Sequence, residues 1–516
     1  MLLHDIVRIA ASRHPDRVAV VAGDRTQTFT ELRDDVWRLA GALGKIGDRG
    51  DRVAILAENL PAYVGAYYGV PAAGMALTFL NYRLHPEEWA WIVNDAGARV
   101  LMVQSRFLAG VWSVRDKLET VETVVVIQDG SPMPDGRGAY DVTFEELLAS
   151  APAEEPAVRG APDELAWLLY TSGTTGFPKG AMLTHTNLLT AIVGLAIEGD
   201  RVEDACSLVA FPLCHVAGYT VPVAHLRGAR IVLPEAFDPE GWMDLVDRHA
   251  VTDTAVAPTM LAMILDHPAL DDHDLSSLRS LGYGAAAMPV EVLRRAIRRF
   301  GPIVRSGFGM TELAGNVLVF TSEAHERAVA GEEHLLASCG VPMSLAEVRV
   351  VDDEDRECPP GVVGEIVVRG DQVLSGYFGN ETATAEAMRG GWFHTGDMAR
   401  RDEEGFFYIV DRRKDMIITG GENVYSREVE EALYLHPGVA EAAVIGLPDE
   451  RWGENVTAVV VLRSGVEATE ADIIDTVRHR LAGYKKPKRV IFSDELPKNV
   501  SGKILKRQLR DRYAPT

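Results

Sequence analysis

The stretch YTSGTTGFPKG, residues 170–180, combines three glycines, four Ser and Thr hydroxyl side chains between Thr171 and Thr175, and a single lysine, Lys179. Glycines let backbone N–H groups approach phosphate oxygens, hydroxyl groups donate hydrogen bonds to them, and a lysine neutralises their charge. The spacing differs from the Walker pattern G-x-x-x-x-G-K-[ST], because Pro178 stands five residues after Gly173 and Gly180 follows the lysine. The stretch therefore predicts a phosphate-binding loop of another type, with a plain surface linker as the alternative.

The segments around this loop predict layered α/β structure. The apolar run AWLLY precedes the loop as an expected strand, and THTNLLTAIVGL follows it as an expected capped helix. Apolar runs and amphipathic helices alternate through the first 300 residues, which is typical of a large domain with largely parallel sheets. The clearest expected elements are buried strands at 52–57, 98–103 and 123–128 and a helix at 289–301.

The pattern changes in the last third of the chain. Between residues 348 and 411, short strand-like runs alternate with Asp, Pro and Gly turns, which predicts a small β-barrel-like subdomain or sheet. The residues after it predict a small α+β domain with the order helix, strand, strand, helix, strand, at 426–436, 440–446, 456–463, 469–482 and 488–492. We therefore expect an N-terminal domain at 1–411 and a C-terminal domain at 412–516.

Composition narrows the class of protein. A chain of 516 residues exceeds what one hydrophobic core organises, and a net charge of −23 argues against nucleic acid or a membrane surface as the main partner. No apolar run reaches the length of a membrane span, and Asp5 and Arg8 interrupt the N-terminal segment, which predicts an amphipathic helix rather than a signal peptide. Four cysteines without C-x-x-C spacing favour reduced thiols. These features predict a cytoplasmic protein without integral membrane association.

Three further clusters contain residue types suited to a nucleotide. In SGFGMTELAG, Phe308 offers an aromatic face for a purine, and Glu312 would need Mg²⁺ between itself and phosphates. In WFHTGD, Asp397 follows a Thr-Gly turn and is a candidate for a bidentate grip on a ribose diol, or simply a turn residue. In LPKNVSGKILKRQLR, Lys503 precedes an expected basic helix, and taken alone it is typical of a solvated surface.

Five stretches occur in a fixed order along the chain: YTSGTTGFPKG, FGMTE, WFHTGD, DRRKD and PKNVSGK. Their order and separation resemble the ANL superfamily of adenylate-forming enzymes, and residues 81–103 and 390–417 look most like its fatty-acid and aryl-acid CoA ligases. The resemblance covers nearly the whole chain. It implies that a carboxylate attacks the α-phosphate of ATP, giving an acyl-adenylate and pyrophosphate, and that the thiol of CoA then takes the acyl group and releases AMP.

The resemblance also implies roles for individual residues, with ATP, Mg²⁺ and CoA as cofactor and co-substrates. Thr174 and Glu312 would lie at Mg²⁺, and Lys503 would bridge the substrate carboxylate and the α-phosphate in the first half-reaction only. Phe308 would stack on adenine, where the family more often has Tyr. The implied catalytic residues are Lys503, Glu312, Thr174 and Lys179. The residues implied to contact ATP or AMP are Thr171, Ser172, Gly173, Thr174, Thr175, Gly176, Lys179, Gly284, Ala285, Ala286, Phe308, Gly309, Met310, Thr311, Asp397, Arg412 and Lys503.

The substrate side is implied by the same resemblance. Amino-acid-activating members place an acidic residue near the segment at 211–219, and this segment has none here. The resemblance therefore implies an uncharged fatty, alicyclic or aryl acid. The residues implied at the substrate are His215, Gly284, Ala285, Gly307 and Gly309, with a purely structural histidine as the alternative for His215.

The two half-reactions imply a moving C-terminal domain, because Lys503 cannot keep its position while a thiol enters. By resemblance, Lys414 is the hinge of this mobile lid. The turn TGGENVY at 419–425 would then replace Lys503 and line the path of CoA, with Gly420, Gly421 and Glu422 closest to it. The nearby basic residues, which either meet CoA phosphates or form a solvated face, are Lys485, Lys486, Lys488 and Arg489.

Two alternatives remain open at this stage. The same residues would serve an acyl-AMP ligase that loads the thiol of an acyl carrier protein instead of CoA. A catalytically inactive nucleotide-binding protein is the more remote alternative, since Lys179, Glu312 and Lys503 are all present. We expect a small carboxylic acid, ATP and CoA as partners, no nucleic acid, and a monomer or homodimer.

Overall fold

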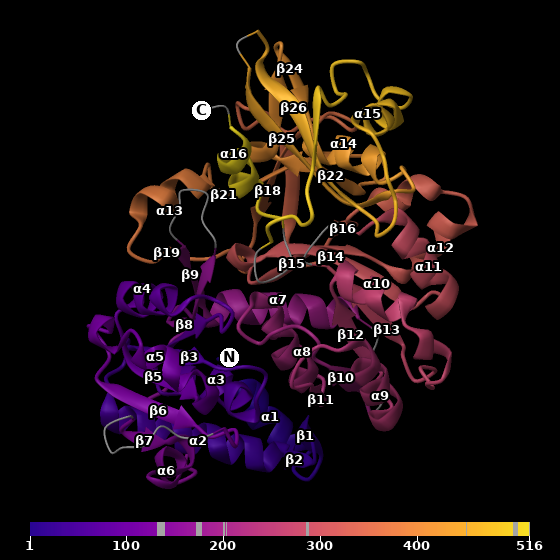
Figure 1. Ribbon diagram of the computed structural model, residues 1–516. Coiled ribbons are helices and arrows are strands. Elements are labelled where there is room, and N and C mark those ends of the chain that lie inside the picture. The colour runs from indigo at the N-terminus through magenta and orange to yellow at the C-terminus, as the bar shows by residue number, and fades with distance from the viewer. Residues whose placement is uncertain are drawn as a thin grey trace. The chain divides into compact units, whose positions relative to one another are not determined.

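The structure is a computed structural model (Figure 1). It describes residues 1–131, 140–171, 178–199, 202, 204–284, 288–449, 451–498 and 504–514. The chain divides into two compact units. The first comprises Met1–Glu333, Pro342–Glu347 and Val368–Phe393, and the second comprises His334–Val341, Val348–Val367 and His394–Thr516. Within the described ranges, no helix is long and apolar enough to cross a membrane.

An eight-stranded sheet in the first unit contains the strands that precede and follow the predicted phosphate-binding stretch. In sheet order its strands are β19 (Gly376–Tyr377), β9 (Lys179–Thr184), β8 (Leu165–Thr171), β4 (Ala76–Leu80), β3 (Arg52–Leu56), β5 (Ala98–Gln104), β6 (Thr123–Ile127) and β7 (Val142–Thr143). The strands from β8 to β7 are parallel, and β9 pairs antiparallel with both β8 and β19. The strands expected at 52–57, 98–103 and 123–128 are confirmed.

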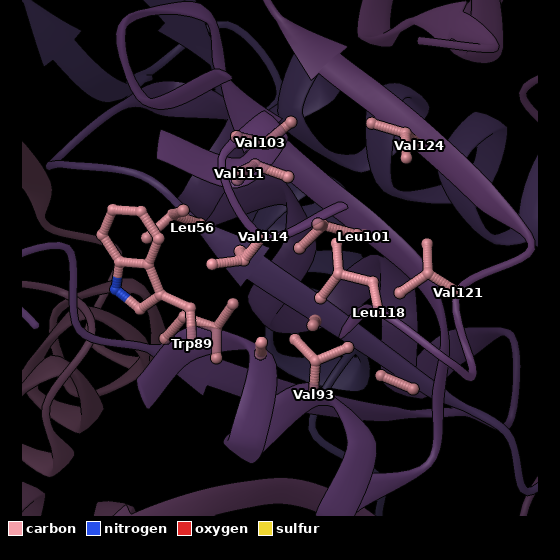
Figure 2. Close-up of a cluster of buried hydrophobic side chains, with 14 of the residues drawn as sticks. Leu56, Trp89, Val93, Leu101, Val103, Val111, Val114, Leu118, Val121 and Val124 are labelled. Carbon is pink, nitrogen blue, oxygen red and sulfur yellow. The ribbon is translucent and has the colours of Figure 1, made fainter. Parts of the chain in front are cut away.

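Aliphatic side chains form the core beside this sheet, as Figure 2 shows. Leu56 and Leu101 extend from the strands, and Trp89 and Val93 from α4 (Pro86–Ala96) pack in the same cluster. Each is at most 6% exposed, and burying such a side chain stabilises the fold by roughly 1.5–3 kcal/mol. This packing makes the sheet a rigid support for the loop strands at its other edge.

A nine-stranded sheet forms the rest of the framework. In sheet order its strands are β16 (Val341–Pro342), β15 (Gly315–Phe320), β14 (Val304–Met310), β13 (Ser280–Tyr283), β12 (Asp253–Val256), β10 (Cys206–Leu208), β11 (Arg230–Leu233), β1 (Val18–Ala22) and β2 (Arg25–Thr28). The strands from β14 to β1 are parallel, and β15 and β2 add antiparallel neighbours. The layered α/β class with largely parallel sheets is thereby confirmed.

The helices of the first unit include the two that the sequence predicts most clearly. The amphipathic N-terminal helix is α1, and the helix expected at 289–301 is α11, which buries Leu293 and Ala296 and is followed by Gly301 at φ +75°. The helices are α1 (Asp5–Arg13), α2 (Phe29–Ile46), α3 (Pro61–Ala72), α4, α5 (Leu108–Trp112), α6 (Phe144–Ala149), α7 (His185–Glu198), α8 (Thr220–Leu226), α9 (Pro239–His249), α10 (Pro258–Asp266), α11 (Val290–Phe300), α12 (Ser322–Ala330) and α13 (Glu381–Ala387).

A five-stranded sheet lies mostly in the second unit. Its strands are β17 (Glu347–Val351), β18 (Gly364–Arg369), β21 (Trp392–Arg401) and β20 (Met388–Arg389), with β22 (Phe407–Arg412) beside β21. Strand β21 is antiparallel to both β20 and β22. The short strands expected between 348 and 411 are therefore present, and they support Asp397 and Arg412.

The C-terminal part of the second unit is the expected α+β fold. Its elements are β23 (Ile417–Thr419), β24 (Glu422–Val424), α14 (Ser426–Leu433), β25 (Val439–Asp449), β26 (Gly453–Leu462), α15 (Glu470–Arg478), β27 (Arg489–Phe492) and α16 (Lys506–Tyr513). The order helix, strand, strand, helix, strand is confirmed, and the short hairpin β23–β24 was not predicted. The second unit groups these elements with the small sheet, so the domain boundary at 411–414 stays a prediction.

Candidate active site

Strands β8 and β9 contain the two described ends of the predicted phosphate-binding stretch, Thr171 and Lys179. Thr171 and Lys179 are register partners across this antiparallel pair. The loop residues implied at the phosphates, which lie outside the described residues, are Ser172, Gly173, Thr174, Thr175 and Gly176. Strand β9 was not predicted, because KGAMLT is too short to show a period and it passes directly into the cap of α7 at Thr184. Lys179 thus begins a strand instead of ending a loop before a helix.

A tyrosine joins the predicted phosphate and metal residues. The hydroxyl of Thr171 and the hydroxyl of Tyr377 each donate to Oε1 of Glu312, at 3.2 Å in both cases. The ammonium of Lys179 lies 5.2 Å from the centroid of the Tyr377 ring. Burial raises the pKa of Tyr377, and the neighbouring Glu312 raises it further, so the hydroxyl stays a donor. Tyr377 was not predicted, since the turn LSGYFGN gives no sign of its distant partners.

Close backbone packing fixes the segment that ends at Glu312. Strands β14 and β15 pair antiparallel, with Phe308 opposite Leu318 and Gly309 opposite Asn316. A side chain at Gly309 would overlap the carbonyl of Gly315, and Gly307 lies against the Asn316 side chain. The half-buried Phe308 lies between these two glycines, and Met310 and Thr311 follow Gly309. These glycines are therefore required by packing, whatever contact they also make with a substrate.

The residues implied at the substrate are only partly described. Gly284 lies beside Gly307, since a Cβ at position 284 would be 3.4 Å from the carbonyl oxygen of Gly307. Ala285, Ala286 and Ala287 lie outside the described residues. Nε2 of His215 is 3.4 Å from Nδ2 of Asn81, and burial lowers the pKa of His215 to about 4. His215 is consequently neutral at pH 7, which suits an uncharged ligand.

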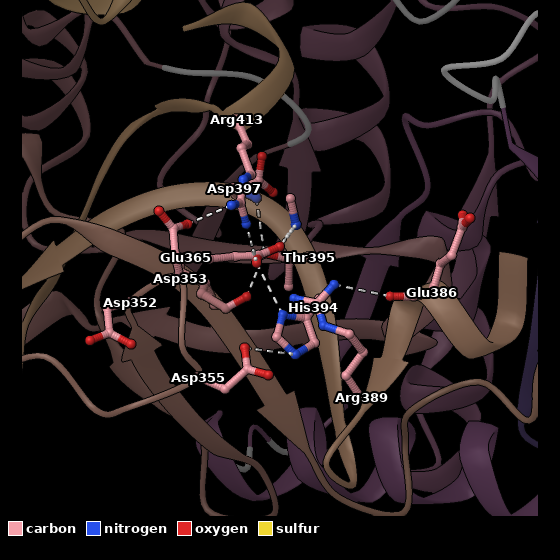
Figure 3. A network of polar contacts seen from close by, with 12 residues as sticks. Asp352, Asp353, Asp355, Glu365, Glu386, Arg389, His394, Thr395, Asp397 and Arg413 are labelled. Carbon is pink, nitrogen blue, oxygen red and sulfur yellow. Dashed lines mark hydrogen bonds and ion pairs between the residues drawn. The ribbon is translucent and has the colours of Figure 1, made fainter. Parts of the chain in front are cut away.

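The two residues predicted at the ribose are partners of each other. Asp397 on β21 and Arg412 on β22 face one another across the strand pair, and Nε of Arg412 lies 2.8 Å from Oδ1 of Asp397. The Asp397 side chain is 4% exposed, whereas that of Arg412 is 35% exposed. The hydroxyl of Thr395, beside Asp397 in Figure 3, accepts from the Asp397 N–H at 3.1 Å. It also donates to the carbonyl of Ile366 at 2.8 Å. The carboxylate is thus held in one orientation.

Ion pairs are formed by the residue that directly follows the predicted hinge, Lys414, and by a residue shortly after Lys503 in the chain. Burial lowers the pKa of Lys414, and the next residue, Asp415, lies 2.8 Å from Nη2 of Arg510 on α16. Lys503 lies outside the described residues. Just after it in the chain, Nζ of Lys506 is 2.7 Å from Oε1 of Glu430 on α14. The roles of Lys414 and Lys503 stay predictions.

The predicted CoA turn is a two-residue β-hairpin. Thr419 pairs with Glu422, and the turn residues Gly420 and Gly421 have φ of +60° and +85°. Such a turn needs a positive φ at both central positions, which glycine adopts without strain. The N–H of Gly420 donates to the carbonyl of Trp452 at 2.8 Å. A side chain at Gly420 would also overlap the Trp452 ring.

Two cationic side chains lie over the ring of Trp452, beside this turn. Nζ of Lys488 lies 3.9 Å, and Cζ of Arg451 lies 4.9 Å, from its ring centroid. The residue is 37% exposed. Trp452 was not predicted. A signal was nonetheless present, because DERWGEN sets one large aromatic residue among charges in a turn between two strands.

The residues near Glu312 are compatible with a Mg²⁺ ion that takes most of its ligands from substrate phosphates and water, and few from the protein. Among the described residues no group of three or more His, Cys, Asp or Glu side chains lies close enough to hold a metal ion. Mg²⁺ commonly keeps several waters and takes one or two carboxylates together with substrate phosphates. The half-buried carboxylate of Glu312, with Thr171 beside it, is compatible with such a site.

Comparison with known proteins places the chain in a family. Residues 7–378 match the AMP-binding enzyme family, and residues 428–503 match the AMP-binding enzyme C-terminal domain. A feruloyl-CoA synthase from an Amycolatopsis species is 42% identical over 506 residues, which covers 98% of this chain and 97% of that protein. The fatty acid–acyl-carrier-protein ligase ScoC from Streptomyces coeruleorubidus is 35% identical over 513 residues, covering 98% and 95%. The solved structure of the amide bond synthetase McbA from Marinactinospora thermotolerans matches with a TM-score of 0.88 at 30% identity, over 100% of both chains.

Proposed function

Because the chain belongs to the AMP-binding enzyme family of adenylate-forming enzymes, we propose that its substrates are an uncharged carboxylic acid, ATP and CoA. The protein is an AMP-forming acid–thiol ligase, as its close relatives are. In the proposed reaction the acid becomes an acyl-adenylate with release of pyrophosphate, and the thiol of CoA then displaces AMP. Both steps need neutralised phosphate charge and fixed orientation of the reacting atoms.

The substrate that we propose is an aryl acid of the feruloyl type, with a fatty acid as the second candidate. The observation that supports the aryl acid is the 42% identity with a feruloyl-CoA synthase along 98% of the chain. An uncharged tail also suits His215, whose pKa burial lowers to about 4, and the absence of acidic residues from the segment at 211–219. The second candidate is supported by the fatty-acid specificity in the name of ScoC.

In the first half-reaction, Glu312 and Lys179 would act on the phosphates. Glu312 and Thr174 would hold Mg²⁺, which would supply positive charge to offset the negative charge of the phosphates. Tyr377 would orient Glu312 by its hydroxyl hydrogen bond. Lys503 would place a point charge between the substrate carboxylate and the α-phosphate, which relieves their repulsion as they approach.

The Asp397 carboxylate would accept hydrogen bonds from both ribose hydroxyls. The Arg412 guanidinium would contact the ribose and the phosphate. The ion pair between these residues supports this proposal, because it fixes the carboxylate before any ligand is present. Preorganised groups lose little rotamer freedom when they bind. The adenine would stack on Phe308, with Gly284 to Met288 on its other face.

In the second half-reaction, the β23–β24 hairpin would line the path of CoA. Gly420 and Gly421 present backbone without side chains, which allows close approach of a narrow chain. The cations of Lys488 and Arg451 gather at Trp452 beside this turn and would neutralise CoA phosphates. This charge supports CoA as acceptor, and the thiol of a carrier protein is the second candidate, supported by the similarity to ScoC.

The proposed function is tested by acid-dependent ATP–pyrophosphate exchange over a panel of acids, followed by mass spectrometry of the thioester. We expect exchange with ferulate that exceeds exchange with dodecanoate, no exchange with amino acids, and feruloyl-CoA as product. Exchange with dodecanoate alone would favour the second substrate. A product that forms only on a phosphopantetheinylated carrier protein would favour the second acceptor, and exchange with no acid in the panel would refute the proposal.

A further inference from the structure

A buried carboxylate on β18, the strand beside β21, contacts residues next in sequence to Asp397 and Arg412, the two residues predicted at the ribose. Glu365 on β18 is 5% exposed. Its Oε1 accepts from the N–H of Gly396 at 2.9 Å, and its Oε2 lies 3.0 Å from Nδ1 of His394 and 3.2 Å from Nη1 of Arg413 (Figure 3). A buried carboxylate with these partners is satisfied, and its removal would leave them without an acceptor.

The sequence positions of these donors give the cluster its meaning. Gly396 directly precedes Asp397, and Arg413 directly follows Arg412. Asp397 and Arg412 are themselves register partners. The Glu365 carboxylate therefore contacts the backbone N–H of Gly396, directly before Asp397. It also contacts the side chain of Arg413, directly after Arg412. The Thr-Gly turn expected from the sequence is instead part of strand β21, where Gly396 has φ +72°. The bond from its N–H to Glu365 fixes the backbone directly before Asp397.

Outer charges reinforce this cluster. Nη2 of Arg413 lies 2.5 Å from Oδ1 of Asp353, and Nε2 of His394 lies 3.7 Å from Oδ1 of Asp355. Arg413 thus bridges two carboxylates, one buried and one exposed. Ion pairs that share one charge restrict one another more than isolated surface pairs do.

We propose that Glu365 is a positioning residue for nucleotide binding. It does not touch ATP, but it fixes Asp397 and Arg412 in the geometry that grips the ribose. This inference rests on the ribose role proposed for Asp397. It goes beyond that role by assigning part of the ribose selectivity to a residue one strand away, through Gly396 and Arg413.

The test compares ATP with 2′,3′-dideoxy-ATP, which lacks both ribose hydroxyls. In Glu365→Gln the shape is kept, but an NH₂ group replaces one acceptor and opposes at least one donor. We expect kcat/KM for acid-dependent pyrophosphate release to fall about 10-fold with ATP and less than about 2-fold with the dideoxy nucleotide, since only a bond to the hydroxyls is weakened. A residue that merely stabilises the sheet would lower both values equally.

Two further variants frame this result. Asp397→Asn measures the full ribose contribution, and we expect it to lose selectivity for ATP over the dideoxy nucleotide. Glu357→Gln is the matched control, because Glu357 is 41% exposed and pairs at 3.3 Å with Arg401 on the same strand β21. The control is expected to change neither nucleotide's kcat/KM.

The outcomes separate the inference from the proposed function. Equal loss on both nucleotides in Glu365→Gln, with selective loss in Asp397→Asn, would overturn the positioning role and leave the ribose contact intact. Equal loss in Asp397→Asn would overturn the ribose contact and the inference with it. If Glu365→Gln does not fold, Arg413→Met removes one half-exposed donor, and a selective loss of about 3-fold is expected there. No selectivity change in that variant would overturn the inference.

Discussion

The phosphate-side cluster (Thr171, Lys179, Glu312 and Tyr377) and the ribose-side cluster (Asp397, Arg412, Arg413, Glu365 and His394) differ in how their charges are used. In the first cluster the two contacts to the Glu312 carboxylate are 3.2 Å long and come from neutral hydroxyls. Within the described ranges no carboxylate pairs with Lys179, whose ammonium lies over a ring. In the second, the guanidinium groups of Arg412 and Arg413 lie 2.8 Å and 3.2 Å from the carboxylates of Asp397 and Glu365.

This difference suggests how each cluster serves a nucleotide. Phosphates and Mg²⁺ carry large charges, so residues that bind them are best left without strong internal partners. Ribose hydroxyls are neutral and form weaker bonds, so a carboxylate that selects them gains from being fixed beforehand. In the proposed function, the first cluster would therefore be open to ionic ligands, and the second would be organised in advance for a neutral one.

The largest predicted effect concerns Lys503, which belongs to neither cluster, so that no residue of either cluster could supply its charge. Lys503→Ala is expected to lower acid-dependent pyrophosphate release about 10²- to 10³-fold, because a charge acting on the transition state is lost. Thioester formation from synthetic acyl-adenylate should be largely retained. Single-turnover assays of each half-reaction measure both rates. Lys498→Met is the matched control, since Lys498 pairs on the surface with Glu441. Equal loss in both half-reactions would contradict separate roles for the two steps.

Glu312 tests the ionic character of the phosphate side. Glu312→Gln keeps the side-chain shape and removes the charge, so we expect about 100-fold slower pyrophosphate release and a higher Mg²⁺ requirement. Asp397→Asn should leave the Mg²⁺ requirement unchanged. Titration of the rate with Mg²⁺ measures both variants, with the exposed Glu326→Gln of α12 as control. A shifted Mg²⁺ requirement in Asp397→Asn would remove the proposed division between the clusters.

Tyr377 sharpens the comparison by a smaller change. Tyr377→Phe removes the hydroxyl that donates to Glu312 and keeps the ring under Lys179. Loss of one neutral hydrogen bond to a carboxylate predicts a decrease of roughly 5-fold in the rate at low Mg²⁺. High Mg²⁺ should restore most of the rate. An unchanged Mg²⁺ titration would show that this hydroxyl does not orient Glu312.

The smallest effect at neutral pH is a difference in acid stability. Burial lowers the pKa of several histidines in the first unit. For five of them the pKa falls far, to about 3 for His185 and about 4 for the others. The five are His4, His185, His215, His225 and His325. Neutral in the folded state, they take up protons on unfolding below pH 6.5. Stability is thus complete above pH 6.5 and falls towards pH 4, by about 1.4 kcal/mol per pH unit for each group.

Calorimetry at pH 7 and pH 5 measures this effect in the whole chain. The expected result is a net proton uptake on unfolding that is several-fold larger at pH 5 than at pH 7, where unfolded histidines with a pKa near 6.5 are mostly neutral. His225→Gln should reduce that uptake, because His225 is fully buried and contacts the hydroxyl of Tyr68. Unfolding without proton uptake at pH 5 would contradict the lowered pKa values.

The sequence predicted local elements better than it predicted their neighbours. The α+β order after residue 412 and the parallel strands of the first unit follow from runs whose periods are visible in a few residues. Strand β9 and the hairpin β23–β24 are three to six residues long, too short for such a signal. Tyr377 was missed because its partner Glu312 is distant in sequence, and the contact of Trp452 with Lys488 is likewise not visible in the stretch around the tryptophan. Likewise, the pairing of Asp397 with Arg412 depends on strand register, which no single motif contains.

The most direct test of the adenylation chemistry follows an oxygen atom. If the carboxylate attacks the α-phosphate of ATP, an acid labelled with ¹⁸O in both carboxylate oxygens must transfer one label to AMP and keep the other in the thioester. Mass spectrometry of AMP, pyrophosphate and acyl-CoA after one turnover measures this transfer. We predict one ¹⁸O in AMP and none in pyrophosphate. Label in inorganic phosphate, or AMP without label, would contradict the acyl-adenylate mechanism.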